Sequence, residues 1–252
     1  MISLNKLGVT YPNGTEALHN ISIELNQGEF TVILGSSGAG KSTLLRCINF
    51  LTYPTSGKVI IEGNGDLNHP KILQKHRQST GMIFQQHQLI PRQTALKNVL
   101  VGRLGYHSTL RSLFPLPKTD QYIALNCLER VGLLEKALTP VQALSGGQQQ
   151  RVGIARALAQ KPKFILADEP IASLDPASSH QVLSNLQKIC QEDRIGALIS
   201  LHQVDLALQY AQRIIGLGKG TILFDCNPSE IKKQQLEEIY QTLSYNPISK
   251  TI

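Results

Sequence analysis

Apolar residues alternate with polar ones, or form short runs, through the first quarter of the chain. This pattern predicts β-strands, separated by turn-forming triplets that contain glycine, asparagine or proline. The strands are expected at residues 2–10, 17–25, 30–34 and 58–62. One helix is expected among them, at residues 40–51. Its apolar residues recur at helical spacing and define one face: Leu44, Leu45, Ile48 and Leu51.

Further along, the apolar period becomes helical. Helices are expected at residues 121–134 and 148–160, and the second stops at Lys161-Pro162, where proline cannot continue a helix. Residues 102–118 are less regular, and we expect them to form a surface excursion. The middle of the chain, about residues 89–157, is therefore predicted to be a helical subdomain inserted into a core of about 1–88 and 158–252.

Two short apolar runs without alternation follow, at residues 164–167 and 197–200. Such runs are typical of strands in a sheet that is covered on both faces. The segments between and after them are expected to be helical. With no internal repeat, low-complexity tract or Gly/Ser linker, the pattern predicts one α/β domain over residues 1–252.

Amino-acid composition excludes only a few classes of protein. Of the 252 residues, 41% are hydrophobic and 17% are charged, which is ordinary for a globular protein and excludes a disordered or fibrous chain. The net charge of +7 favours polyanionic partners such as nucleotides, anionic lipids or nucleic acids. The basic residues are scattered, however, so a plain solvated surface is the favoured interpretation.

The cysteines and the apolar segments indicate the cellular compartment in which the protein is expected. Four cysteines lie far apart, without the spacing of a zinc site or the density of a disulfide scaffold: Cys47, Cys127, Cys190 and Cys226. We expect reduced cytosolic thiols. No segment approaches the ~18 consecutive apolar residues of a membrane span, and the N-terminus lacks a signal peptide. Any membrane association is therefore expected to be peripheral.

A phosphate-binding loop follows the strand at 30–34. The pattern G-x-x-x-x-G-K-[ST] is filled, ahead of Thr43, by Gly35, Ser36, Ser37, Gly38, Ala39, Gly40, Lys41 and Ser42. Backbone amides of such a loop form an anion nest, and the helix that it opens adds partial positive charge. Lys41 is expected to reach the β- and γ-phosphates, and the Ser42 hydroxyl to bind Mg²⁺. The alternative is a glycine-rich turn that only caps a helix.

Two adjacent acids end the apolar strand at 164–167. Neighbouring residues on a strand face opposite ways, so Asp168 and Glu169 can address one site only if the chain leaves the strand here, which Pro170 favours. Asp168 then suits the Mg²⁺ shell, and Glu169 suits the general base that orients an attacking water. Alone, the pair would be interpreted as solvated acids; beside a phosphate loop, the catalytic interpretation is favoured.

Residues 144–148 carry a motif that resembles that of a known family. Leu144-Ser145-Gly146-Gly147-Gln148, with Gln149-Gln150-Arg151 after it, resembles the signature motif of ABC ATPases. Physically, Ser145 is a good helix N-cap, and the glycines expose amides as a second anion site. The resemblance covers nearly the whole chain. It implies a P-loop NTPase of ABC type, with an antiparallel β subdomain, a RecA-like parallel-sheet core and an inserted helical subdomain.

The resemblance also implies roles for single residues. Tyr11 resembles the aromatic that stacks on adenine, and Gln85 the Q-loop glutamine that touches Mg²⁺ or water. Asp175, in Ser173-Leu174-Asp175, resembles the D-loop residue at the subunit boundary, and His202 the switch histidine that contacts the γ-phosphate. Taken singly, each residue has an alternative interpretation. Tyr11 would lie at the edge of the core and Gln85 would be a polar loop residue. Asp175 would cap a helix, and His202 would be a histidine with its hydrogen bonds satisfied.

The family implies an assembly. Two ATPase subunits, expected to be identical, would pair head to tail with ATP between residues 35–43 of one and 144–148 of the other. Transmembrane permease subunits are the implied partners, with a periplasmic solute-binding protein engaged indirectly and no nucleic acid. The implied location is the cytoplasmic face of the bacterial inner membrane, and the implied cofactors are ATP and Mg²⁺.

Finer resemblance is to the ATPases of importers for phosphonate or related phosphorus oxyanions. It is carried by residues 102–114, 169–176, 199–206 and 236–240. Two departures are Ser36, where many relatives have proline, and His87, where an aromatic is common. Alternatives are an importer ATPase for another small solute and a nucleic-acid-associated ATPase. A small-molecule kinase or GTPase switch would leave 144–148 and His202 without a role.

Overall fold

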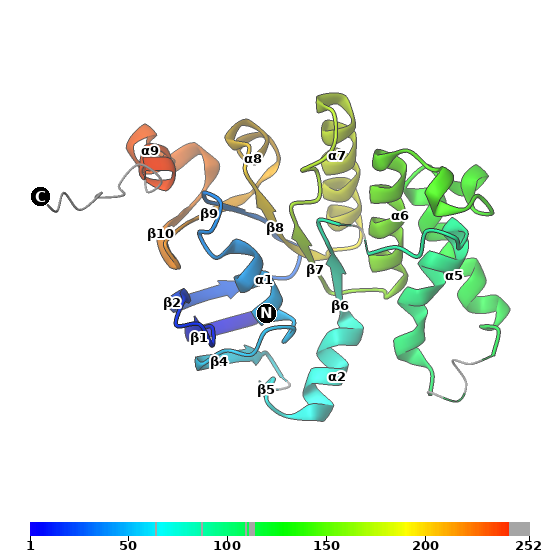
Figure 1. Cartoon of the computed structure of the whole chain (residues 1–252), viewed down its shortest axis with the longest axis horizontal. Coiled ribbons are helices and arrows are strands. Elements are labelled where there is room, and N and C mark those ends of the chain that lie inside the picture. The colour runs from blue at the N-terminus through cyan, green and yellow to red at the C-terminus, as the bar shows by residue number, and fades with distance from the viewer. Residues whose placement is uncertain (64, 87, 109, 111–113, 242–252) are drawn as a thin grey trace, which may run out of the picture.

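The computed structural model describes residues 1–63, 65–86, 88–108, 110 and 114–241; His87 and parts of the stretch 102–118 lie outside them. The described strands form two sheets (Figure 1). The first is antiparallel, in the order β2 (Glu16–Leu25), β1 (Ile2–Thr10), β4 (Ser56–Ile61), β5 (Gly65–Asp66). The second has the order β10 (Thr221–Cys226), β9 (Arg213–Gly218), β3 (Phe30–Leu34), β8 (Gly196–Leu201), β7 (Phe164–Asp168), β6 (Thr80–Ile83).

The second sheet is parallel from β9 to β6, and only β10 runs antiparallel, beside β9. Every residue of β3, β7 and β8 is buried, as expected of strands covered on both faces. Alternate side chains join two different apolar clusters, one on each face of the sheet. The predicted α/β fold, with an antiparallel sheet beside a parallel core, is confirmed.

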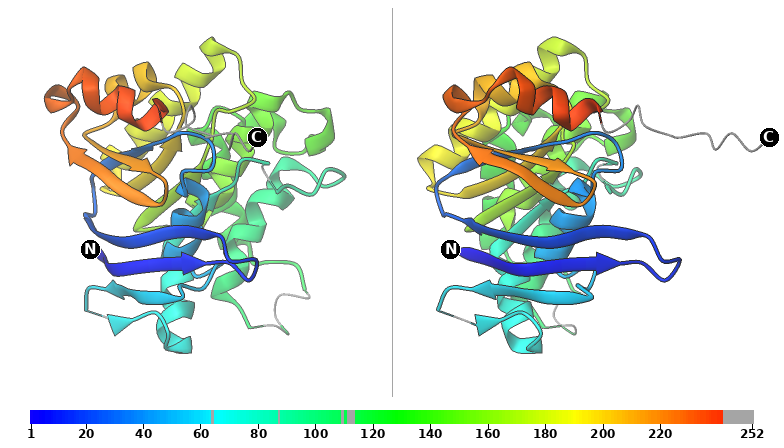
Figure 2. Two further views of the ribbon diagram at one scale, coloured as in Figure 1. Left: turned by 60° about the vertical axis from the view of Figure 1, so that its left-hand side comes forward. Right: turned by 90° about the vertical axis from the view of Figure 1, so that its left-hand side faces the viewer.

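Helix α1 (Lys41–Ile48) lies between the two sheets. Its Leu44, Leu45 and Ile48 are fully buried in the cluster that contains the inward side chains of β1 and β2. Figure 2 shows the antiparallel sheet as a separate layer beneath the parallel one. The helix that follows the glycine loop is therefore held from both sides, which fixes the position of its N-terminus.

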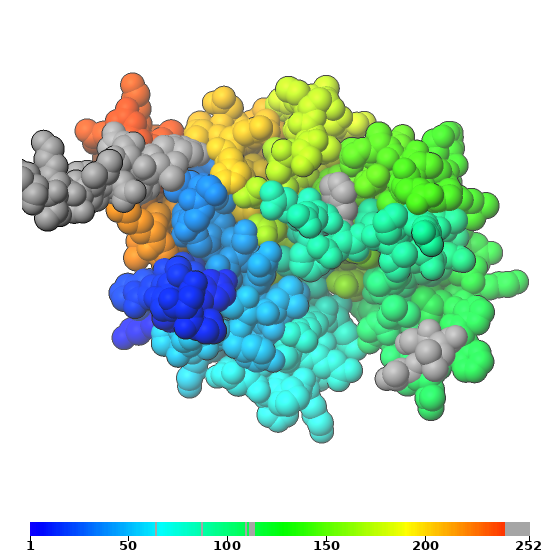
Figure 3. Space-filling model, viewed as in Figure 1, coloured from blue at the N-terminus to red at the C-terminus, as the bar shows by residue number. Residues whose placement is uncertain are grey.

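The other face of the parallel sheet is covered by helices. They are α6 (Gly146–Ala159), α7 (Pro176–Glu192), α8 (Val204–Tyr210) and α9 (Lys233–Gln241). Between β6 and β7 lie α3 (Ala95–Leu100), η1 (Val101–Tyr106), α5 (Lys118–Arg130), η2 (Leu134–Lys136), η3 (Val141–Ala143) and α6. In the space-filling view these helices and the N-terminal sheet occupy opposite ends of one face (Figure 3).

The boundaries of a helical subdomain at 89–157 stay a prediction. Helices between β6 and β7 share one apolar cluster with the parallel sheet, since Val99 and Leu128 belong to the same cluster as Ile83 and Ile165. Packing alone therefore draws no sharp line between the insert and the core.

Several expected elements differ from the structure. Strands β9 and β10 lie where helices were expected after residue 200. The reason is that β9 pairs with β3 on one side and β10 on the other, so Ile214 and Ile215 are buried on both faces. Helix α1 ends at Ile48 instead of residue 51, because Phe50 has a left-handed backbone with φ of 52°.

The described residues of the segment 102–118 are only partly a surface excursion. The segment begins inside η1, where Gly102 and Arg103 are buried against α6. Helix α5 starts at Lys118 and stops at Arg130, just before Gly132 with its φ of 68°. Helix α2 (Pro70–Ser79) and strand β6 had no predicted counterpart. Among the described residues, no helix has both the length and the apolar character to cross a bilayer.

Candidate active site

The glycine loop 35–40 connects β3 to α1 and is shaped by two close contacts. A Cβ on Gly35 would lie 2.5 Å from the Leu217 carbonyl oxygen, so only glycine fits there. Gly40, the residue before α1, has a φ of 104°, and a Cβ on it would lie 2.5 Å from the Ala17 carbonyl oxygen. Glycine at both ends lets the loop fold tightly over the start of the helix.

Lys41 is held inside this loop. Its ammonium donates hydrogen bonds to the carbonyl oxygens of Gly35 at 2.8 Å and Ser36 at 3.0 Å, and the residue is only 4% exposed. Burial lowers the pKa of Lys41, while the carboxylates of Glu169 and Asp168 act in the opposite direction. The loop therefore presents a desolvated cation beside two acids.

Asp168 is fixed by strand register. It lies directly opposite Ser200 on the neighbouring strand β8, and both side chains face α1. The Asp168 Oδ1 accepts a hydrogen bond from the Ser42 hydroxyl at 2.8 Å and another from the Ser200 hydroxyl at 3.1 Å. The first turn of α1 and the end of β7 are thus joined at the carboxylate.

Glu169 leaves the strand. Its φ of 47° is left-handed, a conformation that costs a non-glycine residue about 1–3 kcal/mol. Its carboxylate lines the cavity beside the glycine loop, and the charges of both Glu169 and Asp168 act on Lys41. Gln85 Nε2 donates to Glu169 Oε2 at 3.1 Å, and His202 Nε2 lies 2.5 Å from Oε1. Both oxygens of Glu169 are therefore held by side chains from two other loops.

A cavity of about 460 Å³ joins these groups. Its lining brings together predicted site residues from five segments of the chain: Tyr11, Ser37, Gly38, Gly40, Lys41, Ser42, Thr43, Gln85, Glu169 and His202. Gly35, Ser36 and Ala39 are not in the lining and form the inner part of the loop. Tyr11 lies at the rim, where its hydroxyl is 3.1 Å from Thr43 Oγ1.

The residues of the signature segment are not in the lining of this cavity. Ser145 caps α6: its hydroxyl accepts from the Gln148 amide at 3.3 Å, and Gln148 Oε1 accepts from the Ser145 amide at 3.0 Å. Gly146 and Gly147 lie beside Leu174 of the same chain. The single chain therefore does not bring 145–148 to the loop 35–43.

Asp175 also caps a helix. Its Oδ1 accepts a hydrogen bond from the Ser178 amide at 3.0 Å, and hydrogen bonds from Ser178 lower the pKa of this carboxyl. Like the signature residues, it is absent from the lining of the cavity.

Sequence reasoning missed several residues of the site. Thr15, Glu16 and Ala17 line the cavity beside Tyr11, and no pattern in the sequence marks them. Ser200 is different, because it is a polar residue inside the buried strand β8. A hydroxyl among apolar neighbours two residues before His202 was a usable signal.

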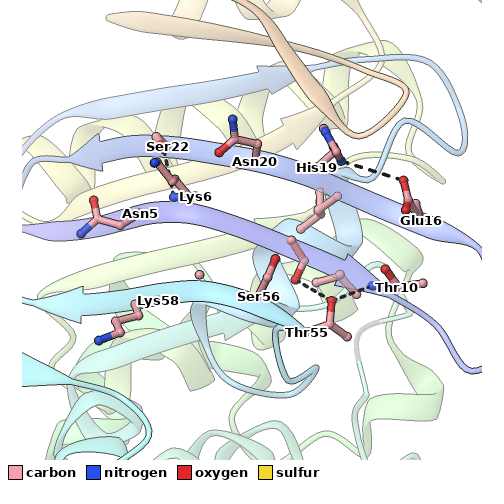
Figure 4. A pocket seen from close by; sticks show the side chains of 14 residues that line it. Asn5, Lys6, Thr10, Glu16, His19, Asn20, Ser22, Thr55, Ser56 and Lys58 are labelled. Atoms are coloured by element: carbon pink, nitrogen blue, oxygen red, sulfur yellow. Dashed lines mark hydrogen bonds and ion pairs between the residues drawn. The ribbon is translucent and has the colours of Figure 1, made fainter.

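A larger hollow lies elsewhere on the described surface. It measures about 870 Å³ and covers the outer face of β1, β2 and β4 (Figure 4). Its lining includes Lys6, His19 and Lys58, but it shares only Glu16 with the cavity at the glycine loop. No buried carboxylate or glycine loop faces it, so volume does not identify the active site here.

Oxygen donors at the cavity suit a hard divalent cation. The Ser42 hydroxyl and the Asp168 carboxylate already touch, and Gln85 brings an amide to the adjacent Glu169. Among the described residues, no group of three or more His, Cys, Asp or Glu side chains could hold a metal. A cation here would thus take most of its ligands from phosphates and water, as Mg²⁺ commonly does.

Comparison with known proteins gives a consistent result. The family model described as "ABC transporter" matches residues 18–172. A phosphonates import ATP-binding protein of Nostoc sp. is 66% identical over 240 residues, covering 95% of this chain and 92% of that protein. A phosphite import ATP-binding protein of Stutzerimonas stutzeri is 59% identical, covering 95% and 87%.

Solved structures agree. A dimeric ATP-binding cassette in a post-hydrolysis state, bound to ADP and Pi, is similar with a TM-score of 0.80 and 34% identity, covering 90% of this chain and 99% of that one. A cassette of an ABC transporter in an ADP conformation is similar with a TM-score of 0.83 and 29% identity, covering 98% and 99%.

Proposed function

The chain belongs to the ABC transporter family, and from that premise we propose that it is the ATP-hydrolysing subunit of an importer for phosphonate or a related phosphorus oxyanion. The observation that carries the ATPase proposal is the position of Glu169. Its carboxylate lines the cavity at the glycine loop, and Gln85 and His202 hold its two oxygens. This is where a general base must lie if water attacks a γ-phosphate held by the loop.

The loop 35–43 would bind the triphosphate. Its amides and the N-terminus of α1 offer hydrogen bonds and positive charge to anionic oxygens. Lys41 would exchange the carbonyl oxygens of Gly35 and Ser36 for phosphate oxygens, which accept more strongly because they are charged. Tyr11, in the lining of the same cavity, would stack on the base.

Glu169 would then accept a proton from the attacking water as the bond from the γ-phosphorus to the bridging oxygen breaks. His202, next to Glu169 Oε1, would donate a hydrogen bond to the γ-phosphate, and Gln85 would orient the water from the other side. The products are ADP and inorganic phosphate. Ser42 and Asp168 fit Mg²⁺, which would neutralise phosphate charge when bound.

Two copies would be needed for the complete site. The amides of Gly146 and Gly147 would form a second anion-binding helix start, yet these residues are not in the lining of the cavity of their own chain. A head-to-tail pair would bring residues 144–148 of one copy to the triphosphate of the other. The similar cassette, which is dimeric, supports a pair of copies.

The substrate class follows from the relatives. Those at 66% and 59% identity are import ATP-binding proteins for phosphonates and phosphite. We infer an ATPase pair attached to permease subunits at the cytoplasmic face of the bacterial inner membrane, with a periplasmic solute-binding protein acting through the permease. ATP would bind at the interface and Mg²⁺ would accompany it.

The test of the ATPase assignment is Glu169→Gln. It should keep ATP binding, lower the turnover number at least ~100-fold because the general base is lost, and accumulate an ATP-bound dimer in gel filtration. Glu129→Gln, at an exposed position on α5, is the matched control and should turn over ATP as the unaltered chain does. Equal turnover by Glu169→Gln and the unaltered chain would refute the role of this carboxylate.

The importer assignment has a separate test. The chain should co-purify with membrane subunits and a solute-binding protein encoded by the same organism. That binding protein should retain phosphonate or phosphite in isothermal titration calorimetry. Retention of an amino acid, with no heat from phosphorus oxyanions, would replace the substrate class and leave the ATPase intact.

A further inference from the structure

Ser200 is a buried hydroxyl beside both acids of the active site. It lies on β8, where its neighbours Ile199 and Leu201 are apolar, and it is 0% exposed. Its Oγ is 3.1 Å from Asp168 Oδ1 and 2.9 Å from the backbone nitrogen of Glu169. A single side chain thus contacts two consecutive residues with different proposed roles: Asp168 at the cation and Glu169 as the general base.

The direction of these two hydrogen bonds follows from the groups involved. An ionised carboxylate only accepts, so the hydroxyl proton of Ser200 goes to Asp168. An amide only donates, so the Glu169 N–H points to a lone pair of the same oxygen. The hydroxyl donates one of these hydrogen bonds and accepts the other, and alanine or valine could not replace either.

The amide of Glu169 needs this acceptor. The parallel ladder between β7 and β8 ends at the pair Asp168 and Ser200, so the next amide has no strand partner in the ladder. Glu169 has already turned into the left-handed region, with φ of 47°. The hydrogen bond from its amide to Ser200 favours this turn, which is what directs the Glu169 carboxylate into the cavity.

Asp168 needs the same hydroxyl for a different reason. Its Oδ1 accepts hydrogen bonds from the hydroxyls of Ser42 on α1 and Ser200 on β8. These two donors hold the carboxylate plane between helix and sheet. Removal of the Ser200 hydroxyl would leave Ser42 as its one side-chain donor among the interactions of the described residues. The carboxylate could then rotate away from the position that suits a cation at Ser42.

We propose that Ser200 is a positioning residue for ATP hydrolysis, which sets the Glu169 turn and the Asp168 carboxylate through one hydroxyl. The proposal rests on the proposed function and deepens it. Ser200 is not in the lining of the cavity where the nucleotide would bind, so it would act through the two acids. Its loss should therefore slow turnover and weaken the response to Mg²⁺ while ATP affinity is retained.

The experiment measures ATP hydrolysis and ATP binding by the full chain carrying Ser200→Ala or Ser200→Thr. Loss of a group that orients a ligand or base commonly costs about 10–100-fold, so kcat of Ser200→Ala should fall by that factor. KM for ATP should change less than about twofold, and the Mg²⁺ concentration for half-maximal activity should rise. Ser200→Thr keeps the hydroxyl and should recover most of kcat.

A matched control is Thr31→Val, which removes a hydroxyl from another buried position of the same sheet. Thr31 lies on β3 near the opposite end of the strand, so this variant should keep kcat and Mg²⁺ dependence. Melting temperatures of all variants report on folding. If Ser200→Ala does not fold, Ser200→Cys retains the side-chain volume with a weaker donor and should give a smaller fall in kcat.

Three results would overturn the proposal: an unchanged kcat in Ser200→Ala, the same fall in Thr31→Val, or a rise in KM with kcat intact. A fall in kcat with no recovery in a folded Ser200→Thr would also count against it, because the hydroxyl would then not be the active element. Absence of ATP turnover by the unaltered chain would instead contradict the proposed function.

Discussion

At the scale of residues, Lys41 shows how the site is prepared before a nucleotide arrives. Two loop carbonyls hold its ammonium, and burial lowers its pKa. A desolvated cation with only neutral acceptors gains strongly from a charged phosphate, because hydrogen bonds between two ions are stronger than those to a carbonyl. The two carbonyl oxygens therefore position the Lys41 ammonium but bind it less strongly than a phosphate would.

Lys41→Ala should weaken ATP binding about 10–100-fold, which is the equivalent of one charge-assisted hydrogen bond of about 1.5–3 kcal/mol. Titration with a fluorescent ATP analogue measures the change in Kd. Lys58→Ala removes an exposed lysine from the outer face of the antiparallel sheet, away from the loop, and should leave Kd unchanged (Figure 4). An equal effect of both substitutions would show that general surface charge binds the nucleotide.

His76 is a buried residue with a consequence for stability. Its Nε2 lies 2.8 Å from the Ile48 carbonyl oxygen and its Nδ1 lies 3.3 Å from Thr80 Oγ1. The carbonyl can only accept, so Nε2 carries the proton and Nδ1 accepts from the hydroxyl. Burial lowers the pKa of His76 from 6.5 to about 4, with a smaller contribution from Arg77 and an opposing one from the Ile48 carbonyl.

The sign of the pH effect follows. Between pH 6.5 and about 4 the unfolded chain binds a proton at His76 that the folded chain does not, so acidification favours unfolding. The loss across this window is about 2–3 kcal/mol at roughly 1.4 kcal/mol per pH unit. Urea denaturation at pH 7, 6 and 5 should show a steeper loss in the unaltered chain than in His76→Gln. His69→Gln, at the exposed start of α2, should keep the steep loss.

At the scale of elements, the 3₁₀ helix η1 is tied to α5 and α6 by a buried polar network. Arg103 Nε donates to Asp120 Oδ1 at 2.8 Å, and His107 Nε2 lies 2.6 Å from Asp120 Oδ2. Arg103 also donates to the Ala159 carbonyl oxygen and lies over the Tyr106 ring. Burial by itself would raise the pKa of Asp120, but the hydrogen bonds from Arg103 and His107 outweigh it and lower that pKa.

Asp120→Asn should destabilise the chain by about 3–5 kcal/mol, because it leaves the buried Arg103 without its counter-charge. The side chains of Arg103 and Asp120 are 9% and 6% exposed. The control is Asp193→Asn, which removes a partner of Arg130 at a side chain 41% exposed and should cost at most about 1 kcal/mol. Urea midpoints compare the two. A smaller loss for Asp120→Asn than for Asp193→Asn would contradict the importance of burial here.

At the scale of the whole molecule, the starts of α1 and α6 belong to one chain but do not share a cavity. The start of α1 faces the glycine loop, and the start of α6 lies beside Leu174 and Ser178. A site that needs both must take them from two chains. ATP would then hold the pair together, and hydrolysis would remove the bridging phosphate.

Gly147→Ala tests this arrangement without disturbing the chain itself. An added Cβ would meet Ser178 Oγ at 3.6 Å and nothing closer, so the variant should fold normally. A nucleotide from a second copy would meet the added methyl, at a cost of about 1–3 kcal/mol for overpacking, so ATP-dependent dimerisation should weaken roughly 5- to 150-fold. Analytical ultracentrifugation in the Glu169→Gln background measures it.

The matched control is Gly153→Ala on the same helix, where an added Cβ meets nothing within 4 Å. It should leave dimerisation unchanged. If Gly147→Ala also dimerises normally, the start of α6 does not meet the nucleotide of another copy.

The sequence by itself determined the local chemistry of this protein. The glycine loop, the strand ending in Asp168 and Glu169, and the capped helix at Ser145 are each encoded within a few consecutive residues. Local patterns succeed there because loop, cap and strand termination depend on short-range backbone preferences. The signature segment then identified the family, which the family match from 18–172 confirmed.

The tertiary structure decided how those pieces meet. Strand β9 could not be recognised, because its burial depends on pairing with β3, nearly two hundred residues earlier in the chain, and β10 in turn pairs with β9. Ser200 joined the site through the register of β7 and β8, and the arrangement of Gln85 and His202 around Glu169 depends on where three strands end. Pairing between distant strands is governed by packing and hydrogen bonding across the sheet, which no short stretch of sequence contains.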